Sequence, residues 1–251
     1  ASPPTIGVIT ALPGKRILSA GASAGIGEAC ARHFAAQGAH LLLSARRLDR
    51  VQEIADELAK EHGIEAHAHA LDVTDREAVQ AYVDGLAANG LVPDVLINNA
   101  GKAKGLDPLQ EGSIDHWDEM IDTNIKGLLY VTRAVLPHMV ERDSGHVINI
   151  GSIAGRWVYP KRAVYNATKF AVKALSEAMN IDLLGTKIRV SSVDPGLTET
   201  EFSDVRFDGD AERAKKVYAD TQPLTPDDVA DACVYVANAP QHVDIFNLVM
   251  M

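Results

Sequence analysis

Short apolar runs alternate with longer stretches of helical periodicity along this chain. Runs typical of buried strands cover residues 17–20, 41–44, 66–71, 95–98, 147–150, 188–193 and 245–249. Between them, apolar residues recur at helical spacing over residues 25–37, 48–61, 75–88, 114–139, 159–184 and 226–238. This alternation predicts an α/β fold, in which helices cover both faces of a doubly wound parallel sheet of about seven strands.

Two of the predicted helices carry start signals. Thr74 followed by Glu77 has the spacing of a capping box, and Thr225 followed by Pro226 predicts an N-cap with proline in the first turn. By contrast, residues 196–210 lack a clear period and contain Arg206 among acidic and aromatic residues. Long irregular segments in compact domains are commonly binding loops, so we expect a substrate lid over residues 196–224, with a plain surface loop as the alternative.

Size and composition indicate one domain. A chain of 251 residues with 47% hydrophobic content can bury a large core, so we predict a single domain over residues 1–251 with an N-terminal extension at 1–14. The formal net charge of −10 argues against a nucleic-acid partner. No stretch reaches the roughly 18 apolar residues of a membrane span, and Cys30 and Cys233 lack metal-ligand spacing. We therefore expect a soluble, cytoplasmic protein with reduced thiols and no metal.

A glycine-rich turn follows the first predicted strand and opens the first predicted helix. Glycines let the backbone approach a pyrophosphate, whose charge is held by the free amides and positive dipole end of the helix. An ordinary tight turn is the alternative, but the position in the first strand–helix unit favours a dinucleotide site. The residues expected to hold it are Gly21, Ser23, Ala24, Gly25, Ile26 and Gly27.

The second predicted strand is followed by Ala45, Arg46 and Arg47, at the place where a dinucleotide fold meets the adenosine ribose. An acidic residue here would accept hydrogen bonds from a 2′-hydroxyl, whereas guanidinium groups suit a 2′-phosphate. Two solvated arginines are the alternative, but the helix dipole disfavours cations at a helix start. We therefore expect NADP(H) as the cofactor, with Arg46 and Arg47 on its 2′-phosphate.

Polar residues also follow later strands, at the sheet edge where open α/β sheets bind ligands. Asp72 and Val73 follow the third strand, Asn98-Asn99-Ala100-Gly101 the fourth, and Ser152 the fifth. Tyr165 and Lys169 come next, and their spacing of four places them on one helical face. A neighbouring ammonium favours the phenolate, which would let Tyr165 exchange a proton; an accidental surface pair is the alternative.

Together these motifs resemble the short-chain dehydrogenase/reductase family, from Lys15 to Met251. The resemblance implies a Rossmann-type domain in which Tyr165 exchanges the proton, Ser152 orients the substrate oxygen, and Lys169 binds the nicotinamide ribose and makes Tyr165 more acidic. Asn124 matches the family asparagine that holds a water in the proton relay. Ala20 departs from the family threonine, which affects a structural hydrogen bond more than catalysis. Implied cofactor contacts are Asp72, Val73, Asn99, Ala100, Gly101, Tyr165, Lys169, Pro195, Gly196, Leu197 and Thr198.

Within the family, residues 201–210 and 224–229 are similar to NADP-dependent 3-hydroxy acid dehydrogenases, including serine and allo-threonine dehydrogenases. Sulfoacetaldehyde reductases share these features, so the resemblance implies an acidic hydroxy substrate without separating carboxylate from sulfonate. Basic residues cluster at Lys102 and Lys104, and again at Arg156, Lys161 and Arg162. The candidate substrate contacts are Ser152, Lys102, Arg156 and Arg206, with Arg206 first among the cations and solvated surface charge as the alternative.

Three functions remain in competition. The leading one is NADP-dependent interconversion of a short 3-hydroxy acid, of the serine, allo-threonine or 3-hydroxyisobutyrate type, and its oxo form. The second is an NADPH-dependent reductase of small aldehydes or ketones such as sulfoacetaldehyde, and the third is a noncatalytic NADP-binding regulator. The joint presence of Asn124, Ser152, Tyr165 and Lys169 argues against the regulator. The resemblance also implies a homotetramer, with the helices of Asn124 and Tyr165 in one interface and residues 246–251 near another.

Overall fold

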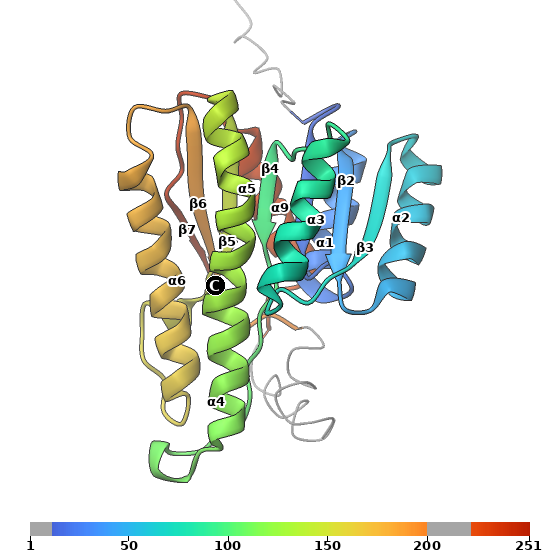
Figure 1. Cartoon of the computed structure of the whole chain (residues 1–251). Helices are drawn as coiled ribbons and strands as arrows, with labels where there is room; N and C mark the ends of the chain where they lie inside the picture. The colour runs from blue at the N-terminus through green and yellow to red at the C-terminus, as the bar shows by residue number, and fades with distance from the viewer. Residues whose placement is uncertain (1–11, 200–221) are drawn as a thin grey trace, which may run out of the picture.

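The structure, a computed structural model, describes residues 12–199 and 222–251. Its parallel sheet has seven strands in the order β3-β2-β1-β4-β5-β6-β7 (Figure 1). The order reverses between β1 and β4, which makes a topological switch point of the kind where doubly wound sheets bind ligands. The strands are β1 (Arg16–Ala20), β2 (His40–Ala45), β3 (Ala66–Ala70), β4 (Val95–Asn98), β5 (Gly145–Ile150), β6 (Ile188–Pro195) and β7 (Asn247–Met250).

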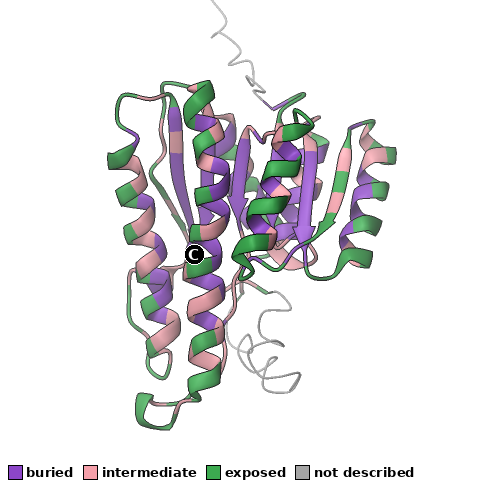
Figure 2. Cartoon of the chain, in the orientation of Figure 1, coloured by how far each residue is buried: buried purple, intermediate pink, exposed green. Residues whose placement is uncertain are grey.

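Helices cover the sheet on both sides. One apolar cluster joins α1, α2 and α9 to one face, and a second joins α3, α5 and α6 to the other. Figure 2 shows the buried residues concentrated in the central strands and the inner helix surfaces. The helices are α1 (Gly25–Ala36), α2 (Leu48–His62), α3 (Arg76–Ala88), α4 (Ile114–Ile121), α5 (Leu128–Arg142), α6 (Ala163–Asp182) and α9 (Pro226–Asn238). The predicted fold class and the alternation of strands and helices are confirmed.

Three local predictions need correction. The single helix expected over residues 114–139 is divided into α4 and α5 by a π-helical turn, Asp122–Gly127. The helix expected from residue 159 begins at Ala163, because Lys161 has a left-handed backbone with a φ of 59°. The cap of α3 is Asp75, whose carboxylate accepts the amides of Glu77 and Ala78. Thr74 cannot serve as that cap because its amide and hydroxyl both bond Asp72.

The cap predicted at Thr225 is confirmed. Its hydroxyl accepts the Asp228 amide at 3.2 Å, and the Asp228 carboxylate accepts the Thr225 amide at 2.7 Å. This complete capping box satisfies two of the amides that a helix start leaves without partners.

Both ends of the predicted lid belong to the ordered structure around the sheet. Thr198 and Leu224 form a β-bridge, and the Glu199 amide donates to the Leu224 carbonyl at 2.8 Å. Residues 200–221, including Arg206, lie outside the described residues, as does the N-terminal extension before Leu12. Leu12 itself is buried against the core. Among the helices of the described ranges, none is long and apolar enough to cross a bilayer.

Candidate active site

The candidate site lies along the carboxyl edge of the sheet. Figure 1 shows α4 and the first turns of α6 extending beyond that edge. The loops after β1, β2, β4, β5 and β6 all leave the sheet there, because parallel strands end at a common edge. Residues far apart in the sequence are thereby brought to one place.

The glycine-rich turn has the geometry that a phosphate requires. Gly21 has a φ of 87°, and a Cβ on it would stand 2.8 Å from the Cα of Ala100, so only glycine fits. Its carbonyl accepts the side-chain amide of Asn99 at 2.8 Å, which fixes the turn to the end of β4. Ala24, the N-cap of α1, supplies no side-chain cap, so the first-turn amides are available to an anion. These features fit a dinucleotide pyrophosphate.

The exposed arginines after β2 lie beside this turn. Arg47 donates to the hydroxyl of Ser23 at 3.2 Å and to its carbonyl at 3.3 Å. Partial burial acts to raise the pKa of Asp72, but hydrogen bonds from Thr74, with the charges of Arg46 and Lys102, outweigh it and hold the pKa below its usual range. The ends of β1 and β2 therefore bring Ser23 and Arg47 together, and the charge of Arg46 acts on Asp72 after β3. The binding of a 2′-phosphate by these arginines stays a prediction.

The two asparagines after β4 have different roles. Asn99 binds the glycine-rich turn, whereas Asn98 points into the core and donates to Thr132 and to Asn149, each at 2.9 Å. Asn98 therefore ties β4 to α5 and to β5. Only Asn99 acts directly on the cofactor turn.

Asn124 lies in the π-helical turn, is 2% exposed, and holds the loop that follows Gly101. Its Oδ1 accepts the Lys102 amide at 2.7 Å, and its Nδ2 donates to the Lys102 carbonyl at 2.8 Å and to Thr168 Oγ1 at 3.0 Å. Thr168 precedes Lys169 on α6. Asn124 therefore joins the loop after β4 to the helix of the Tyr165 and Lys169 pair; π turns occur often at functional sites.

Lys169 is buried, and its ammonium donates to the Ile150 carbonyl at 2.9 Å, two residues before Ser152. A Cβ on Gly101 would lie 3.5 Å from Asn124 Oδ1 and 4.0 Å from Lys169 Nζ, so these three residues meet. Ser152 opens the 3₁₀ turn Ile153–Gly155, where its hydroxyl oxygen accepts the Ala154 amide at 3.1 Å. The hydroxyl proton remains for a ligand oxygen. Tyr165, half-buried in the first turn of α6, lies one helical turn from Lys169.

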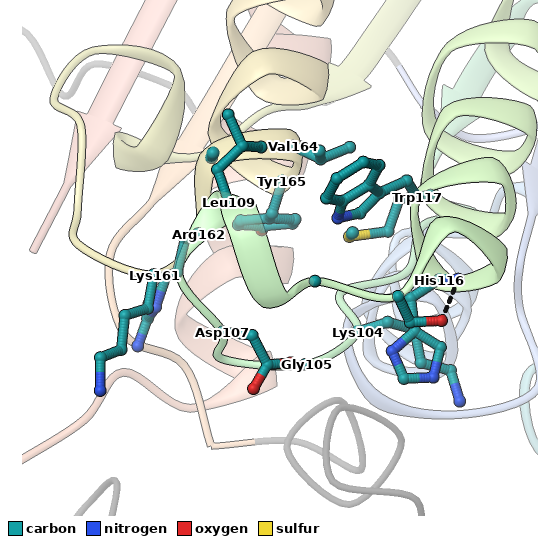
Figure 3. Close-up of a pocket in the computed structure, with 14 residues that line it drawn as sticks. Lys104, Gly105, Asp107, Leu109, His116, Trp117, Lys161, Arg162, Val164 and Tyr165 are labelled. Carbon is teal, nitrogen blue, oxygen red and sulfur yellow. Dashed lines mark hydrogen bonds between the residues drawn. The ribbon is translucent and has the colours of Figure 1, made fainter.

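A small pocket that is open to solvent adjoins Tyr165. Figure 3 shows Lys161 and Arg162 on one side of it, and Lys104 and His116 on the other. Asp107 lies between these two sides, and Trp117 lies on the side of His116 (Figure 3). The sequence marks the lysines and the arginine as basic clusters, but it carries no signal for Asp107, His116 or Trp117. The loop that brings them together has no periodicity.

Two of the cations expected to contact substrate have internal partners. Lys102 pairs with Glu119 at 2.9 Å, and Arg156 pairs with Asp194 at 2.6 Å. The third, Arg206, lies outside the described residues. Within the described parts of the chain, no group of three or more His, Cys, Asp or Glu side chains is placed to hold a metal ion.

Comparisons with known proteins agree with this geometry. The family model for short chain dehydrogenases matches residues 15–211. NADP-dependent 3-hydroxy acid dehydrogenase YdfG of Escherichia coli O157:H7 is 48% identical over 236 residues, which cover 94% of each chain. Sulfoacetaldehyde reductase 2 of Chromohalobacter salexigens is 43% identical over 236 residues, covering 94% of this chain and 93% of its own.

Among solved structures, the closed form of serine dehydrogenase complexed with NADP+ superposes with a TM-score of 0.89 at 46% identity, covering 94% of each chain. The present chain belongs to the short-chain dehydrogenase family, a class of oxidoreductases built on this fold.

Proposed function

We propose that the protein is an NADP-dependent oxidoreductase that interconverts a short 3-hydroxy acid and its oxo form, with Tyr165 as the acid/base. The observation that carries this proposal is the junction of Asn124, Lys169 and Gly101 beside the Ser152 loop. It lies on the sheet edge that also holds the glycine-rich turn. A noncatalytic NADP-binding protein needs that turn and the arginines but has no use for this junction.

The glycine-rich turn and Lys169 would hold NADP(H), which would supply or accept the hydride. Tyr165 takes the proton of the substrate hydroxyl during oxidation and returns it to the carbonyl oxygen during reduction. The ammonium of Lys169, held by Ile150, stabilises the phenolate by its charge. Ser152 donates its hydroxyl proton to the same substrate oxygen, and Asn124 keeps the Lys102 backbone in place.

The acid group of the substrate is assigned to the pocket beside Tyr165. Lys161 and Arg162 line it, and neither forms an ion pair with a carboxylate of the described residues; Arg162 stacks on Tyr159 at 5.8 Å from the ring centre. Carboxylate and sulfonate are both anions that such cations attract. The proposal therefore covers serine, allo-threonine and 3-hydroxyisobutyrate as substrates, with Arg206 as a further candidate contact.

A second candidate is the reduction of small aldehydes or ketones such as sulfoacetaldehyde, favoured by the likeness to sulfoacetaldehyde reductase 2. The deciding assay follows NADPH absorbance against serine, allo-threonine, 3-hydroxyisobutyrate and isethionate with NADP, and against the matching aldehydes with NADPH. Turnover of the hydroxy carboxylates supports the first function. Turnover of sulfoacetaldehyde or other aldehydes alone supports the reductase function. Cofactor binding without any turnover would favour the noncatalytic NADP-binding regulator.

Tyr165→Phe tests the acid/base role. Removing the hydroxyl leaves no group to exchange the proton, so kcat should fall by on the order of 10³-fold while NADPH still binds. Tyr235→Phe, at a tyrosine that is 64% exposed on α9, is the control and should retain wild-type activity. A fully active Tyr165→Phe enzyme would remove Tyr165 from the mechanism.

We also propose that the chain forms a homotetramer in the cytoplasm. Exposed apolar side chains in and beside the last strand and on the outer surface of α6 support the assembly: Phe246, Val249, Met251 and Phe170. The cytoplasm is proposed because both cysteines are free thiols, as is usual in a reducing compartment. Light scattering on the purified protein measures the assembly directly, and a monomer would refute it.

A further inference from the structure

Arg156 directly follows the 3₁₀ turn that begins at Ser152. Its Nε donates to Asp194 Oδ2 at 2.8 Å, and its Nη2 donates to Asn247 Oδ1 at 2.8 Å. The second carboxylate oxygen of Asp194 accepts the hydroxyl of Ser192. Arg156 thus links three segments that are distant in sequence: the Ser152 loop, the end of β6, and β7.

Asp194 is a buried charge, with its side chain 3% exposed. A carboxylate in such a place is costly unless it is paired and hydrogen-bonded. It lies directly before Pro195 and Gly196, two of the residues expected to contact the cofactor. The ion pair therefore forms at the boundary between the proposed proton-transfer residues and the cofactor.

The Ser152 loop is tightly packed at both ends of the turn. A Cβ on Gly151 would overlap the Asp194 carboxylate, so that carboxylate lies against the residue preceding Ser152. A Cβ on Gly155 would overlap the main chain of Lys169, so the other end is pressed against α6. Arg156 closes this packing, because its guanidinium holds the carboxylate from the outer side.

We propose that Arg156 and Asp194 form a positioning pair that sets the Ser152 hydroxyl in register with Tyr165 and the nicotinamide. In this proposal the pair acts through the backbone of residues 151–156 and not by contact with substrate or cofactor. The inference rests on the proposed oxidoreductase function. It also assigns Arg156 a role other than binding the acid group of the substrate.

Single-turnover kinetics of NADPH oxidation distinguish a positioning role from a purely stabilising one. The amplitude measures the fraction of active enzyme, and the rate constant reports how well the reacting groups are placed in that fraction. In Arg156→Gln and Asp194→Asn the rate constant should fall by on the order of 10²-fold, as expected for a misplaced reacting group, with the amplitude kept. Arg156→Lys keeps the charge but cannot reach both partners, so its rate constant should be intermediate. Asn247→Ala removes the outer bond alone and should have a smaller effect.

Arg142→Gln is the matched control. Arg142 has a side chain 36% exposed, lies 3.8 Å from the Asp94 carboxylate, and donates to the carbonyls of Pro93 at 2.8 Å and of Ser144, but at the opposite end of the strands. It should react at the wild-type rate. Wild-type rate constants in Arg156→Gln and Asp194→Asn, with losses confined to amplitude or melting temperature, would overturn the proposal. If Arg156→Gln fails to fold, the rate constants of Arg156→Lys and Asn247→Ala test the proposal instead. Reduced rate constants support it, and wild-type rate constants overturn it.

A second readout does not depend on turnover. The amides of residues 154–157 all donate within the turn, to Ser152 or Ile153. Hydrogen exchange of these amides should accelerate in Arg156→Gln and stay unchanged in Arg142→Gln; unchanged exchange in both would refute the positioning role. If the wild-type protein turned over no compound of the panel, the proposed function would fail, and the exchange result would still test the pair.

Discussion

Single side chains at the carboxyl edge of the sheet connect neighbouring loops by hydrogen bonds. Asn124 binds the Lys102 backbone through both ends of its amide, and Asn99 binds the carbonyl of Gly21. Each of these contacts replaces a flexible loop position with a fixed one. The site is therefore preorganised before any ligand arrives, which lowers the ordering cost of binding.

Arg46 and Arg47, the arginines after β2, lead to a prediction about which cofactor the protein prefers. Arg46→Ala and Arg47→Ala each remove a guanidinium expected on the 2′-phosphate, and a hydrogen bond to a charged group contributes about 1.5 to 3 kcal/mol. The Kd for NADPH should rise roughly 10- to 100-fold in each, while the Kd for NADH changes little. Fluorescence titration measures both.

Arg133→Ala, at an exposed arginine on α5, is the control for charge alone. A parallel loss of NADH and NADPH affinity in the Arg46 and Arg47 variants would contradict the 2′-phosphate assignment.

At the scale of elements, Arg189 fastens the end of α9 to β6. Its guanidinium donates to the carbonyls of Ala239 at 3.0 Å, of Ala237 at 3.2 Å and of Val243 at 3.2 Å. A helix leaves its last carbonyls without internal partners, and a cation at that end also meets the negative end of the dipole. Burial lowers the pKa of Arg189, with Asp244 acting in the opposite direction, so the contact carries a desolvation cost.

Arg189→Met should lower the free energy of unfolding by about 2 to 3 kcal/mol, because buried carbonyls lose a charged donor. Urea denaturation followed by circular dichroism measures the change. Lys60→Met, on the exposed side of α2, should be close to neutral. A stabilised Arg189→Met protein would mean that desolvation of the guanidinium outweighs its hydrogen bonds.

For the whole molecule, a buried histidine links stability to pH. His146 is 2% exposed within β5 and shares a hydrogen bond of 2.8 Å with Ser191 on β6. Burial, with a smaller contribution from the charge of Arg189, lowers the pKa of His146 from 6.5 to about 3. The folded state therefore keeps this ring neutral over a range in which the unfolded chain protonates it.

Between pH 6.5 and about 3 the unfolded state binds one more proton at His146, so acidification favours unfolding. This single group should reduce the free energy of unfolding by roughly 1.4 kcal/mol per pH unit across most of that window. His146→Asn, which can still bond Ser191, should lose this part of the slope in urea denaturation at pH 4 to 6. The same substitution at exposed His242 is the control, and equal slopes in wild type and His146→Asn would contradict the prediction.

Much of the candidate site could be predicted from the sequence because its residues follow strands. Gly21 and Asn99 lie directly after an apolar run, Ser152 lies two residues after one, and parallel strands end at one edge. The placement of Tyr165 and Lys169 on one face of a helix could be predicted from the helical repeat alone. The Thr74 cap failed because Asp72 and Asp75 compete for the same backbone, a competition of hydrogen bonds that spacing alone does not resolve.

The order and period of the apolar residues determined by themselves the layered architecture of a parallel sheet covered by helices and the sheet edge expected to carry the chemistry, whereas the strand order came from the structure. They do so because backbone hydrogen bonding and burial of one helix face leave few arrangements. Only the tertiary structure decided how the cations are used. Lys102 pairs with Glu119, which is 44% exposed, and Arg156 pairs with Asp194, which is 3% exposed and 38 residues away in the chain, so charges that look alike in the sequence differ in their partners and in how deeply those partners are buried.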